Sequence, residues 1–495
     1  MIAEHLPILQ VVLPLLAAPV CIFLRNPRAA GALAVLTSWS ALGIALSLLR
    51  EVMSTGVVSY AIGDWAPPIG IEYRVDIVNA WVLVIVATIG AVVTPYAITS
   101  VESEVDRKRI PLFYAAYLLC LTGLLGITIT GDVFNVFVFL EISSLSAYAL
   151  IAMGQRRRAL TAAFRYLIMG SVGATFIVIG IGLLYVMTGT LNMADLAALL
   201  PEVWDSRTVK VAYGFLGVGM CLKLALFPLH LWLPNAYAFA PSAVTAFMAS
   251  TATKVAVYML LRLFLSIFGR HFSFEVMGLD LILLPLALVA IVSMSLVAIF
   301  QVDVKRLLAY SSVAQIGYMI LGLSFASVTG LTATLLHLFN HALMKGALFM
   351  ALGCVVYRIG SVHIDAMVGL GKRMPYTMAA FVVGGLSLVG VPLTVGFVSK
   401  WYLILGALEK GGLWMGVAAI VLVTSVMALV YVWRVVEVAY LRDFAGDERV
   451  REAPWSLLVP TWALVLANLY FGIDAVRTSA VARGAAEALM IGIGS

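Results

Sequence analysis

Charged residues are scarce in this sequence, at 11% of 495 residues, whereas soluble proteins carry about a quarter. The sequence also lacks any long polar stretch that could separate soluble domains. The spacing of its four cysteines supports neither a zinc site, nor an iron–sulfur cluster, nor a disulfide framework: Cys21, Cys120, Cys221 and Cys354. We therefore expect a single polytopic membrane domain, with no metal and no cofactor.

The N-terminus has no basic region ahead of its first apolar run, which follows Glu4 and His5. A secretory signal peptide needs such a region, so we interpret this run as a retained span. The formal net charge of +6 does not indicate a nucleic-acid partner, because the basic residues sit in short loops and form no continuous face.

Apolar runs of about 20 residues, the length that crosses a bilayer, predict an all-α polytopic protein with about fourteen transmembrane helices. The runs lie near 6–24, 29–49, 77–100, 111–130, 132–153, 160–187, 209–239, 241–268, 280–300, 307–328, 331–357, 376–408, 412–440 and 454–472. The segment 191–204 is too short and polar to span, which indicates an interfacial or external helix. The Ala-rich tail, 474–495, is expected to lie along the membrane or a partner.

Lys and Arg gather in alternate loops, and this pattern predicts the orientation of the chain. The basic loops hold Arg25, Arg28, Arg107, Lys108, Arg109, Arg156, Arg157, Arg158, Lys305, Arg306, Arg358, Lys372, Arg373, Arg442, Arg449 and Arg451. By the positive-inside rule these loops face the cytoplasm, so both termini are expected outside it, in a cell (inner or plasma) membrane.

The stretch 214–260 is the most informative part of the sequence. Its apolar run is interrupted by Pro228 and Pro234, which we expect to break the helix into two halves. It carries three basic side chains at membrane depth: Lys223, His230 and Lys254. A lysine near the bilayer centre costs about 3 kcal/mol, which favours an interior polar path. The alternative is that the lysines reach the interface or form buried pairs that only hold helices together.

A second interrupted span contains Gly390, Pro392, Gly396 and Lys400, five spans after the first. Paired breaks of this kind indicate a transporter built from inverted repeats. We therefore divide the single membrane domain into N-terminal helices (1–105), a first five-helix repeat (111–269), a second (280–441), and a last helix with the tail (453–495). The alternative is that Pro and Gly are simply frequent in membrane helices.

Other ionisable side chains fall at similar depth. Glu141 lies about 14 Å along its helix from Asp132, near mid-membrane, and Lys223 is its candidate partner, since an ammonium keeps a buried carboxylate ionised.

His337, His341 and Lys345 follow each other at four-residue spacing and so share a helix face. We interpret this face as a hydrated proton relay. Packing histidines and a metal pair are the alternatives, although no third ligand accompanies the pair. Connecting water could be held by Ser143, Ser144, Ser311, Ser312 and Gln315, or these side chains could bond between helices.

Taken together, these motifs resemble the antiporter-like subunits shared by respiratory complex I, membrane-bound hydrogenases and Mrp-type multisubunit cation/proton antiporters. The segments GDVFNVFVFLEISSLSAYALIA and LFPLHLWLPNAYAFAPSAVTAFMASTATK look most like the D subunit of the Mrp Na⁺/H⁺ antiporters. The resemblance covers the chain from about residue 111 to about residue 441.

The resemblance implies a proton half-channel in each repeat and a role for each matching residue. Glu141 and Lys223 would be the coupling pair, Lys254 the link to the central axis, His337 and His341 its continuation, and Lys400 the terminal exchange residue. Some family members carry a glutamate where Lys400 stands, so the polarity of the exit step is not uniform across the family. The implied partners are other membrane subunits, H⁺, Na⁺ or K⁺, and the lipid bilayer. Two alternatives remain open: a proton-pumping subunit of a redox complex, and a non-conducting scaffold.

Overall fold

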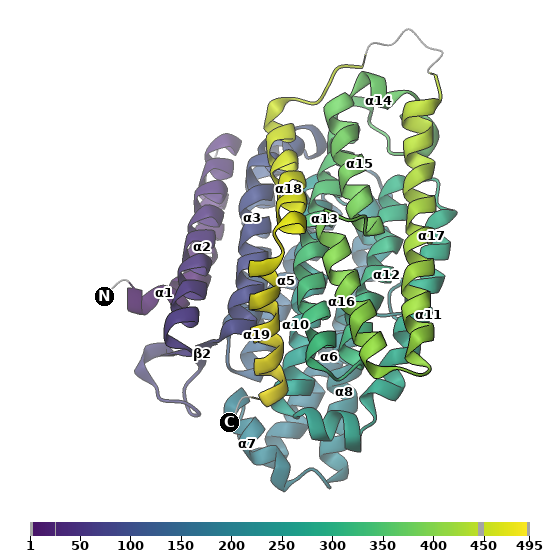
Figure 1. Cartoon of the computed structure of the whole chain (residues 1–495). Helices are drawn as coiled ribbons and strands as arrows, with labels where there is room; N and C mark the ends of the chain where they lie inside the picture. Colours follow the sequence, from purple (N-terminus) through teal and green to yellow (C-terminus); the bar gives the residue numbers. More distant parts are fainter. Residues whose placement is uncertain (1–2, 25, 444–449, 493–495) are drawn as a thin grey trace.

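The computed structural model describes residues 3–24, 26–443 and 450–492, so Arg25 and Arg449, two of the predicted loop charges, lie outside it. The chain forms a bundle of long, roughly parallel or tilted helices (Figure 1). The N-terminal part consists of α1 (Leu6–Phe23), α2 (Pro27–Thr55) and α3 (Ile77–Glu104). A small antiparallel hairpin, β1 (Val58–Ala61) and β2 (Glu72–Val75), connects α2 to α3.

The segment predicted as the first repeat contains α4 (Ile110–Ile129), α5 (Val133–Ala152), α6 (Arg158–Thr188), α8 (Arg207–Leu224), α9 (Leu233–Phe239) and α10 (Ser242–Leu261). The short helix α7 (Met193–Leu199) precedes α8 and agrees with the non-spanning helix predicted over 191–204. α8 and α9 are the two halves of the broken span. The second repeat contains α11 (Leu279–Ile299), α12 (Val304–Ser324), α13 (Val328–Ile359), α14 (Leu370–Arg373), α15 (Pro375–Val389), α16 (Val395–Lys410) and α17 (Trp414–Leu441), with α15 and α16 as its broken span.

Twelve helices in the described residues are long and apolar enough to cross a membrane. The two broken spans account for the other two predicted passes, so fourteen is an approximate number of passes and not a count of continuous helices. The helices differ in burial: nearly all residues of α10 and α12 and most residues of α13 are buried, whereas fewer than half of the residues of α2, α6, α11 and α17 are. Polar groups on α10, α12 and α13 are therefore shielded from lipid by the surrounding helices.

The first half of each broken span ends in the same way in both repeats. Ala225 caps α8 with φ of 60°, and Gly390 caps α15 with φ of 90°, so the chain leaves both helices through the left-handed region. The first span is broken as predicted, and Pro228 lies in the connection between its two halves. α8 ends before Pro228, and Pro234 lies in the first turn of α9, where a proline is tolerated.

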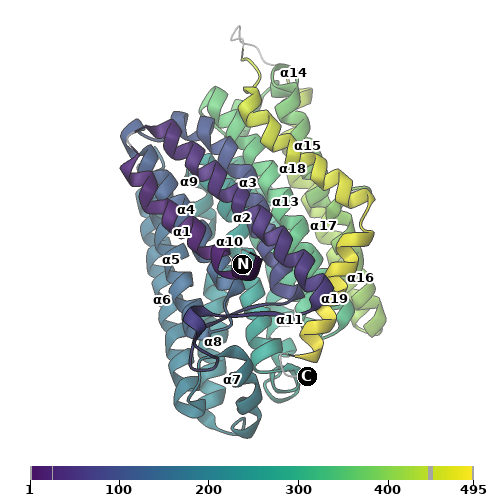
Figure 2. The ribbon, with the colours of Figure 1, turned by 90° about the vertical axis from the view of Figure 1, so that its left-hand side faces the viewer.

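The C-terminal segment forms α18 (Trp455–Ile473) and α19 (Val476–Ile491), which pack against α3 and α13 (Figures 1 and 2). The tail predicted to lie along the membrane or a partner is thus a helix against this chain's own core, with Ala482, Ala485 and Leu489 buried. Small residues on this face allow close helix packing.

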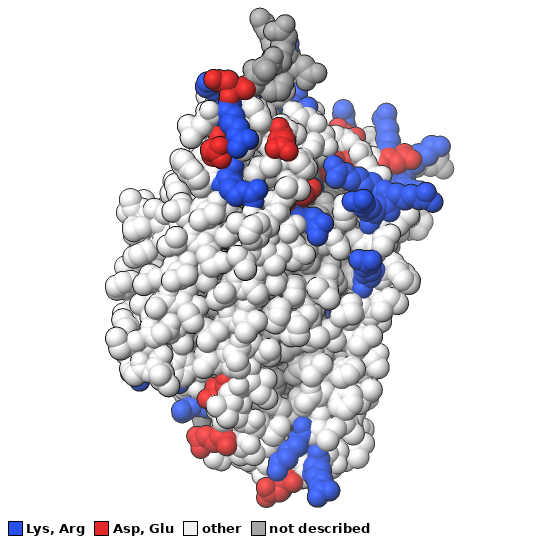
Figure 3. Space-filling view, turned by 90° about the vertical axis from the view of Figure 1, so that its right-hand side faces the viewer, with Lys and Arg blue, Asp and Glu red and all other residues white. Residues whose placement is uncertain are grey.

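Lys and Arg side chains gather at one end of the molecule, the end that carries α14, and only a few lie at the opposite end of the face in Figure 3. The wide belt between the two ends shows almost no charged side chains. This distribution is the one that a membrane-spanning bundle needs, because charges are costly in the hydrocarbon region and favourable at its borders.

Candidate functional site

Glu141 and Lys223 form an ion pair between α5 and α8, with 3.5 Å between Lys223 Nζ and Glu141 Oε1. The ammonium also donates a hydrogen bond of 3.0 Å to Ser144 Oγ, one turn further along α5. Asp132 caps the start of α5 by accepting from the Asn135 backbone N–H at 2.7 Å, which fixes the depth of Glu141. The structure therefore brings together the two residues that were predicted as partners. The Lys223 side chain is 6% exposed and the Glu141 side chain 28%.

Lys254 lies on α10 and is completely buried. Its ammonium donates to the Ala249 carbonyl and, at 3.3 Å, to Thr253 Oγ1, and it forms no ion pair with any described residue. It interacts electrostatically with His341 and Lys345 on α13, the helix that packs directly against α10. Complete burial excludes the alternative in which Lys254 reaches the membrane interface.

His337, His341 and Lys345 lie on one face of α13, as their spacing predicts, but their surroundings differ. The His337 ring pairs with Ser399 Oγ at 2.8 Å and with Gln315 Oε1 at 2.9 Å. The His341 ring stacks on that of His337 at a centroid distance of 5.9 Å, and neither of its nitrogens has a hydrogen-bond partner among the described residues.

The Lys345 ammonium, one turn beyond His341, donates to the Leu308 carbonyl at 2.8 Å and to Ser311 Oγ, both on α12. The predicted polar residue Ser311 thus contacts a lysine of the site, as Gln315 contacts His337. No group of three or more His, Cys, Asp or Glu that could hold a metal ion occurs in the part of the chain that the structure describes.

Lys400 lies in α16, shortly after the second break. Its ammonium donates to the Leu388 and Val389 carbonyls at 3.1 and 2.8 Å and to Ser425 Oγ on α17 at 2.9 Å. The last carbonyls of a helix have no partner within it and carry a partial negative charge, so the end of α15 is a suitable place for a cation. The Tyr318 ring also lies 5.2 Å from the ammonium.

His230 is the one predicted site residue that lies outside a helix. It lies in the connection between α8 and α9, is buried, and stacks on Phe227 at a centroid distance of 5.4 Å. No hydrogen bond or ion pair joins it to another predicted site residue within the described ranges, and its Nδ1 has no partner there. The other predicted residues lie on helices that pack against one another in turn: the ion pair joins α5 to α8, α8 packs against α10, α10 against α13, and α13 against α16, and Figure 2 shows these helices side by side in the bundle.

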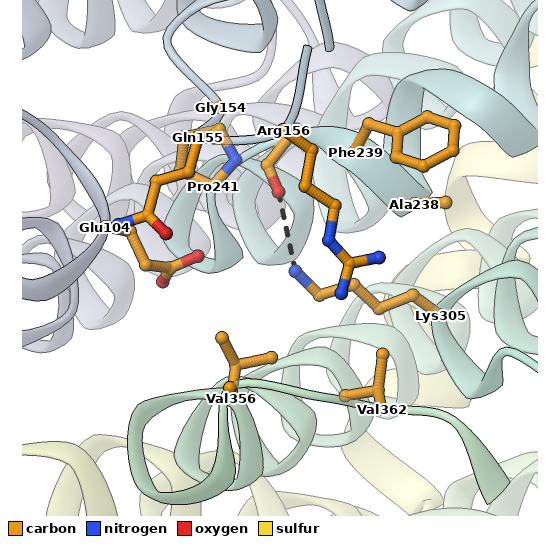
Figure 4. Close-up of a pocket in the computed structure, with 12 residues that line it drawn as sticks. Glu104, Gly154, Gln155, Arg156, Ala238, Phe239, Pro241, Lys305, Val356 and Val362 are labelled. Carbon is orange, nitrogen blue, oxygen red and sulfur yellow. Dashed lines mark hydrogen bonds between the residues drawn. The ribbon is translucent and has the colours of Figure 1, made fainter. Parts of the chain in front are cut away.

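Lys305 differs from its predicted place in a loop. It is 4% exposed at the start of α12, where its ammonium donates to Ser242 Oγ at 3.1 Å and to the Ala240 carbonyl at 3.4 Å. Glu104, at the end of α3, accepts from the Ser242 backbone N–H at 2.9 Å. Lys305 and Glu104, with Gln155, border a cleft of about 70 Å³ where both repeats and α3 meet (Figure 4). Buried hydrogen bonds compensate the cost of burying the Lys305 charge. The sequence did not reveal this burial, because Lys305 lies beside a loop.

A second polar connection that the sequence did not reveal joins Asp76, at the start of α3, to Arg262, which follows α10. Their side chains form an ion pair, and Arg262 Nε also donates to the Tyr258 hydroxyl at 3.1 Å. Burial by itself would raise the pKa of the Asp76 carboxyl, but the Arg262 guanidinium and the Asn79 backbone N–H bring that pKa below its usual value. The partners are far apart in sequence, so no local pattern marks them. The pair ties the hairpin end of the bundle to the first repeat.

Comparison with known proteins gives consistent matches. Residues 130–428 match the family model described as NADH:quinone oxidoreductase/Mrp antiporter, TM. The NADH-quinone oxidoreductase subunit N of Desulforudis audaxviator is 44% identical over 95% of this chain and 96% of its own length. The D subunit of the Na⁺/H⁺ antiporter of Bacillus subtilis is 29% identical over 98% and 97%. A chain of the Mrp complex from Dietzia sp. superposes with a TM-score of 0.90 at 26% identity, covering 99% of this chain and 98% of that one.

Proposed function

Since the chain belongs to the NADH:quinone oxidoreductase/Mrp antiporter transmembrane family, we propose that it is the proton-translocating subunit of a multisubunit Na⁺/H⁺ antiporter. The observation that carries this proposal is the line of ionisable side chains from separate helices inside the bundle: Glu141, Lys223, Lys254, His337, His341, Lys345 and Lys400. It contains four lysines and one carboxylate. A purely structural network would balance its charges more closely, because unpaired buried ions are costly.

Transfer along this line rests on the coupling of neighbouring charges. Protonation of Glu141 removes the charge that holds the Lys223 ammonium at 3.5 Å and frees that ammonium to move. The next lysine, Lys254, has only neutral oxygen acceptors, so a proton on it is sensitive to charges on His341 and Lys345. His341, whose nitrogens are free of protein partners among the described residues, can both accept and donate through water.

Each repeat contributes one half of this path. In the first repeat, Lys223 lies just before the break that ends α8, and in the second repeat Lys400 lies shortly after the break between α15 and α16. Half-helix ends at mid-membrane are the usual place for coupling ions in transporters with inverted repeats. Moving one charge across the membrane potential involves about 2.3 kcal/mol per 100 mV, which is comparable to a shift of one or two units in proton affinity. Exchange then couples proton entry here to cation movement in this subunit or a partner.

A second candidate function is a proton-pumping subunit of a redox complex, in which other subunits supply the electron transfer. The relative at 44% identity that is named NADH-quinone oxidoreductase subunit N favours it. Both functions use the same line of side chains in a transport subunit of a larger membrane assembly, and they differ in the energy source that the partner subunits provide.

The test uses everted membrane vesicles that contain the complete complex. An Na⁺ or K⁺ pulse should collapse an imposed pH gradient, and Glu141→Ala or Lys223→Ala should abolish this response. Lys210→Ala, at the other end of α8, is the matched control and should exchange normally. Normal exchange in both site variants would refute the assigned path, whereas a pH gradient generated by an added electron donor without Na⁺ would favour the redox complex.

A further inference from the structure

A basic cleft lies next to the cleft of Figure 4, and Phe239 borders both. It measures about 240 Å³. Side chains of α6, α9 and α12 line it without any acidic residue: Arg158, Thr161, Arg165, Asn235, Phe239 and Arg306. The path proposed above uses none of these residues.

The three arginines of this cleft lack a counter-ion. Within the described ranges, none of them takes part in an ion pair, and Arg306 Nε is buried without a hydrogen-bond partner. Arg158 and Arg165 lie about two turns apart on α6, so they project from the same face of this helix. Three guanidinium groups around one small cleft repel each other, and an anion between them would relieve the repulsion.

The cleft opens beside a surface that suits lipid. Arg165 is exposed on α6, about 10 Å from the start of that helix. Its neighbours Leu160, Phe164 and Ile168 are exposed at 59%, 61% and 48%. An arginine in such apolar surroundings extends towards the headgroup level and needs an anionic partner there. The cleft thus combines positive charge at the headgroup level with an apolar flank at the level of acyl chains.

We propose that this cleft binds the phosphate headgroup of an anionic phospholipid, with the acyl chains along the exposed face of α6. Guanidinium groups bind phosphate oxygens in a bidentate way, and basic pockets between membrane helices suit such headgroups. A carboxylate on a partner subunit could supply the charge but would leave the apolar flank without a role. The cleft lies where α6 and α12 begin, directly after the predicted cytoplasmic loops that carry Arg157 and Lys305, so anionic lipids of the cytoplasmic leaflet would be located there under the predicted orientation.

The experiment uses the complete complex, purified in detergent, stripped of lipid and then mixed with phosphatidylglycerol or phosphatidylcholine. Native mass spectrometry counts retained lipids, and a thermal melt measures stabilisation. We expect wild type to retain and be stabilised by phosphatidylglycerol alone. Arg165→Gln and Arg306→Gln should each weaken retention about fivefold, and Arg165→Lys, which keeps the charge, should restore most of it. Arg157→Gln is the matched control, since Arg157 is exposed beside Arg158 but does not line the cleft.

Three outcomes would overturn the proposal. Equal retention by wild type and both Gln variants would place the lipid elsewhere. Equal stabilisation by inorganic phosphate in lipid-free detergent would assign the cleft to a free anion. Loss of a neighbouring subunit from both Gln variants, with unchanged lipid retention, would assign the arginines to a protein interface. Folding of each variant is checked by the amount of intact complex, and Arg165→Lys provides a readout if Arg165→Gln does not assemble.

Discussion

His337 and His341 are one turn apart on α13, yet their environments predict opposite effects of substitution. Both ring nitrogens of His337 are paired, with Ser399 and Gln315, so His337→Leu leaves the buried Gln315 Oε1 without its partner and leaves Ser399 Oγ with only its 3.4 Å bond to the Gly396 carbonyl. We expect a loss of about 1–3 kcal/mol in the stability of the complex. His341 has no partner for either nitrogen among the described residues, so His341→Leu should leave stability unchanged or raise it.

The two histidines are also distinguished by the effect that their substitution should have on transport. If His341 passes protons through bound water, His341→Leu should reduce cation-dependent proton movement about tenfold or more, the loss expected when a general acid–base is removed. A chemical or thermal melt of the purified complex and the vesicle assay are measured on the same preparations. A His341→Leu complex that is stable and exchanges at the wild-type rate would show that this histidine only packs.

Single residues also show where sequence reasoning reaches its limit. The depth of Glu141 along its helix was enough to predict Lys223 as its partner, because few groups can stabilise a carboxylate in the bilayer. The partners of Lys400 could not be predicted. Its ammonium binds carbonyls that become free only because α15 ends at Val389, and a serine on α17 whose orientation depends on tertiary packing.

At the scale of helices, the breaks depend on backbone conformation more than on proline. Pro95 and Pro285 lie inside continuous helices, whereas the cap of α8, Ala225, comes two residues after Lys223 and ahead of Pro228. The number and order of helices followed from apolar run length, since a bilayer permits few other structures. The position of the second break also followed, since Gly390 caps α15. The cap of the first break did not, because a residue such as Ala225 is rarely left-handed and only its tertiary contacts select that conformation.

The second break depends on a close approach between its two halves, which gives a prediction for Gly396. A Cβ at this glycine would lie 1.8 Å from the Ser387 carbonyl oxygen, so Gly396→Ala must push α16 away from α15. The Lys400 ammonium would then lose its carbonyl acceptors. We expect a stability loss of about 1–3 kcal/mol together with loss of exchange.

Gly416→Ala is the control for this substitution, since the added Cβ meets nothing within 4 Å on α17. Alanine also favours a helix over glycine by about 0.5–1 kcal/mol, so this variant should be as stable as wild type or slightly more stable. Thermal melts of the two variants, compared at equal protein concentration, measure the difference. Equal melting temperatures would mean that α15 and α16 can separate without cost.

At the scale of the whole molecule, the ends of the bundle differ in charge, and this difference predicts its orientation in the membrane. Arg157 directly precedes α6 in one of the basic loops, and Arg270 follows α10 in one of the loops between them. The positive-inside rule places Arg157 in the cytoplasm and Arg270 outside it. Both side chains are exposed, so each can be replaced by cysteine without loss of a buried contact.

Arg157→Cys should therefore react with a membrane-impermeant thiol reagent only in everted vesicles, and Arg270→Cys only in intact cells. The natural cysteines give little background, since Cys21, Cys120 and Cys354 are buried and Cys221 lies within α8. Labelling with the opposite sidedness would show that the chain has the opposite orientation in the membrane. The basic cleft would then face the outer leaflet, and the lipid proposal would need an anionic lipid there.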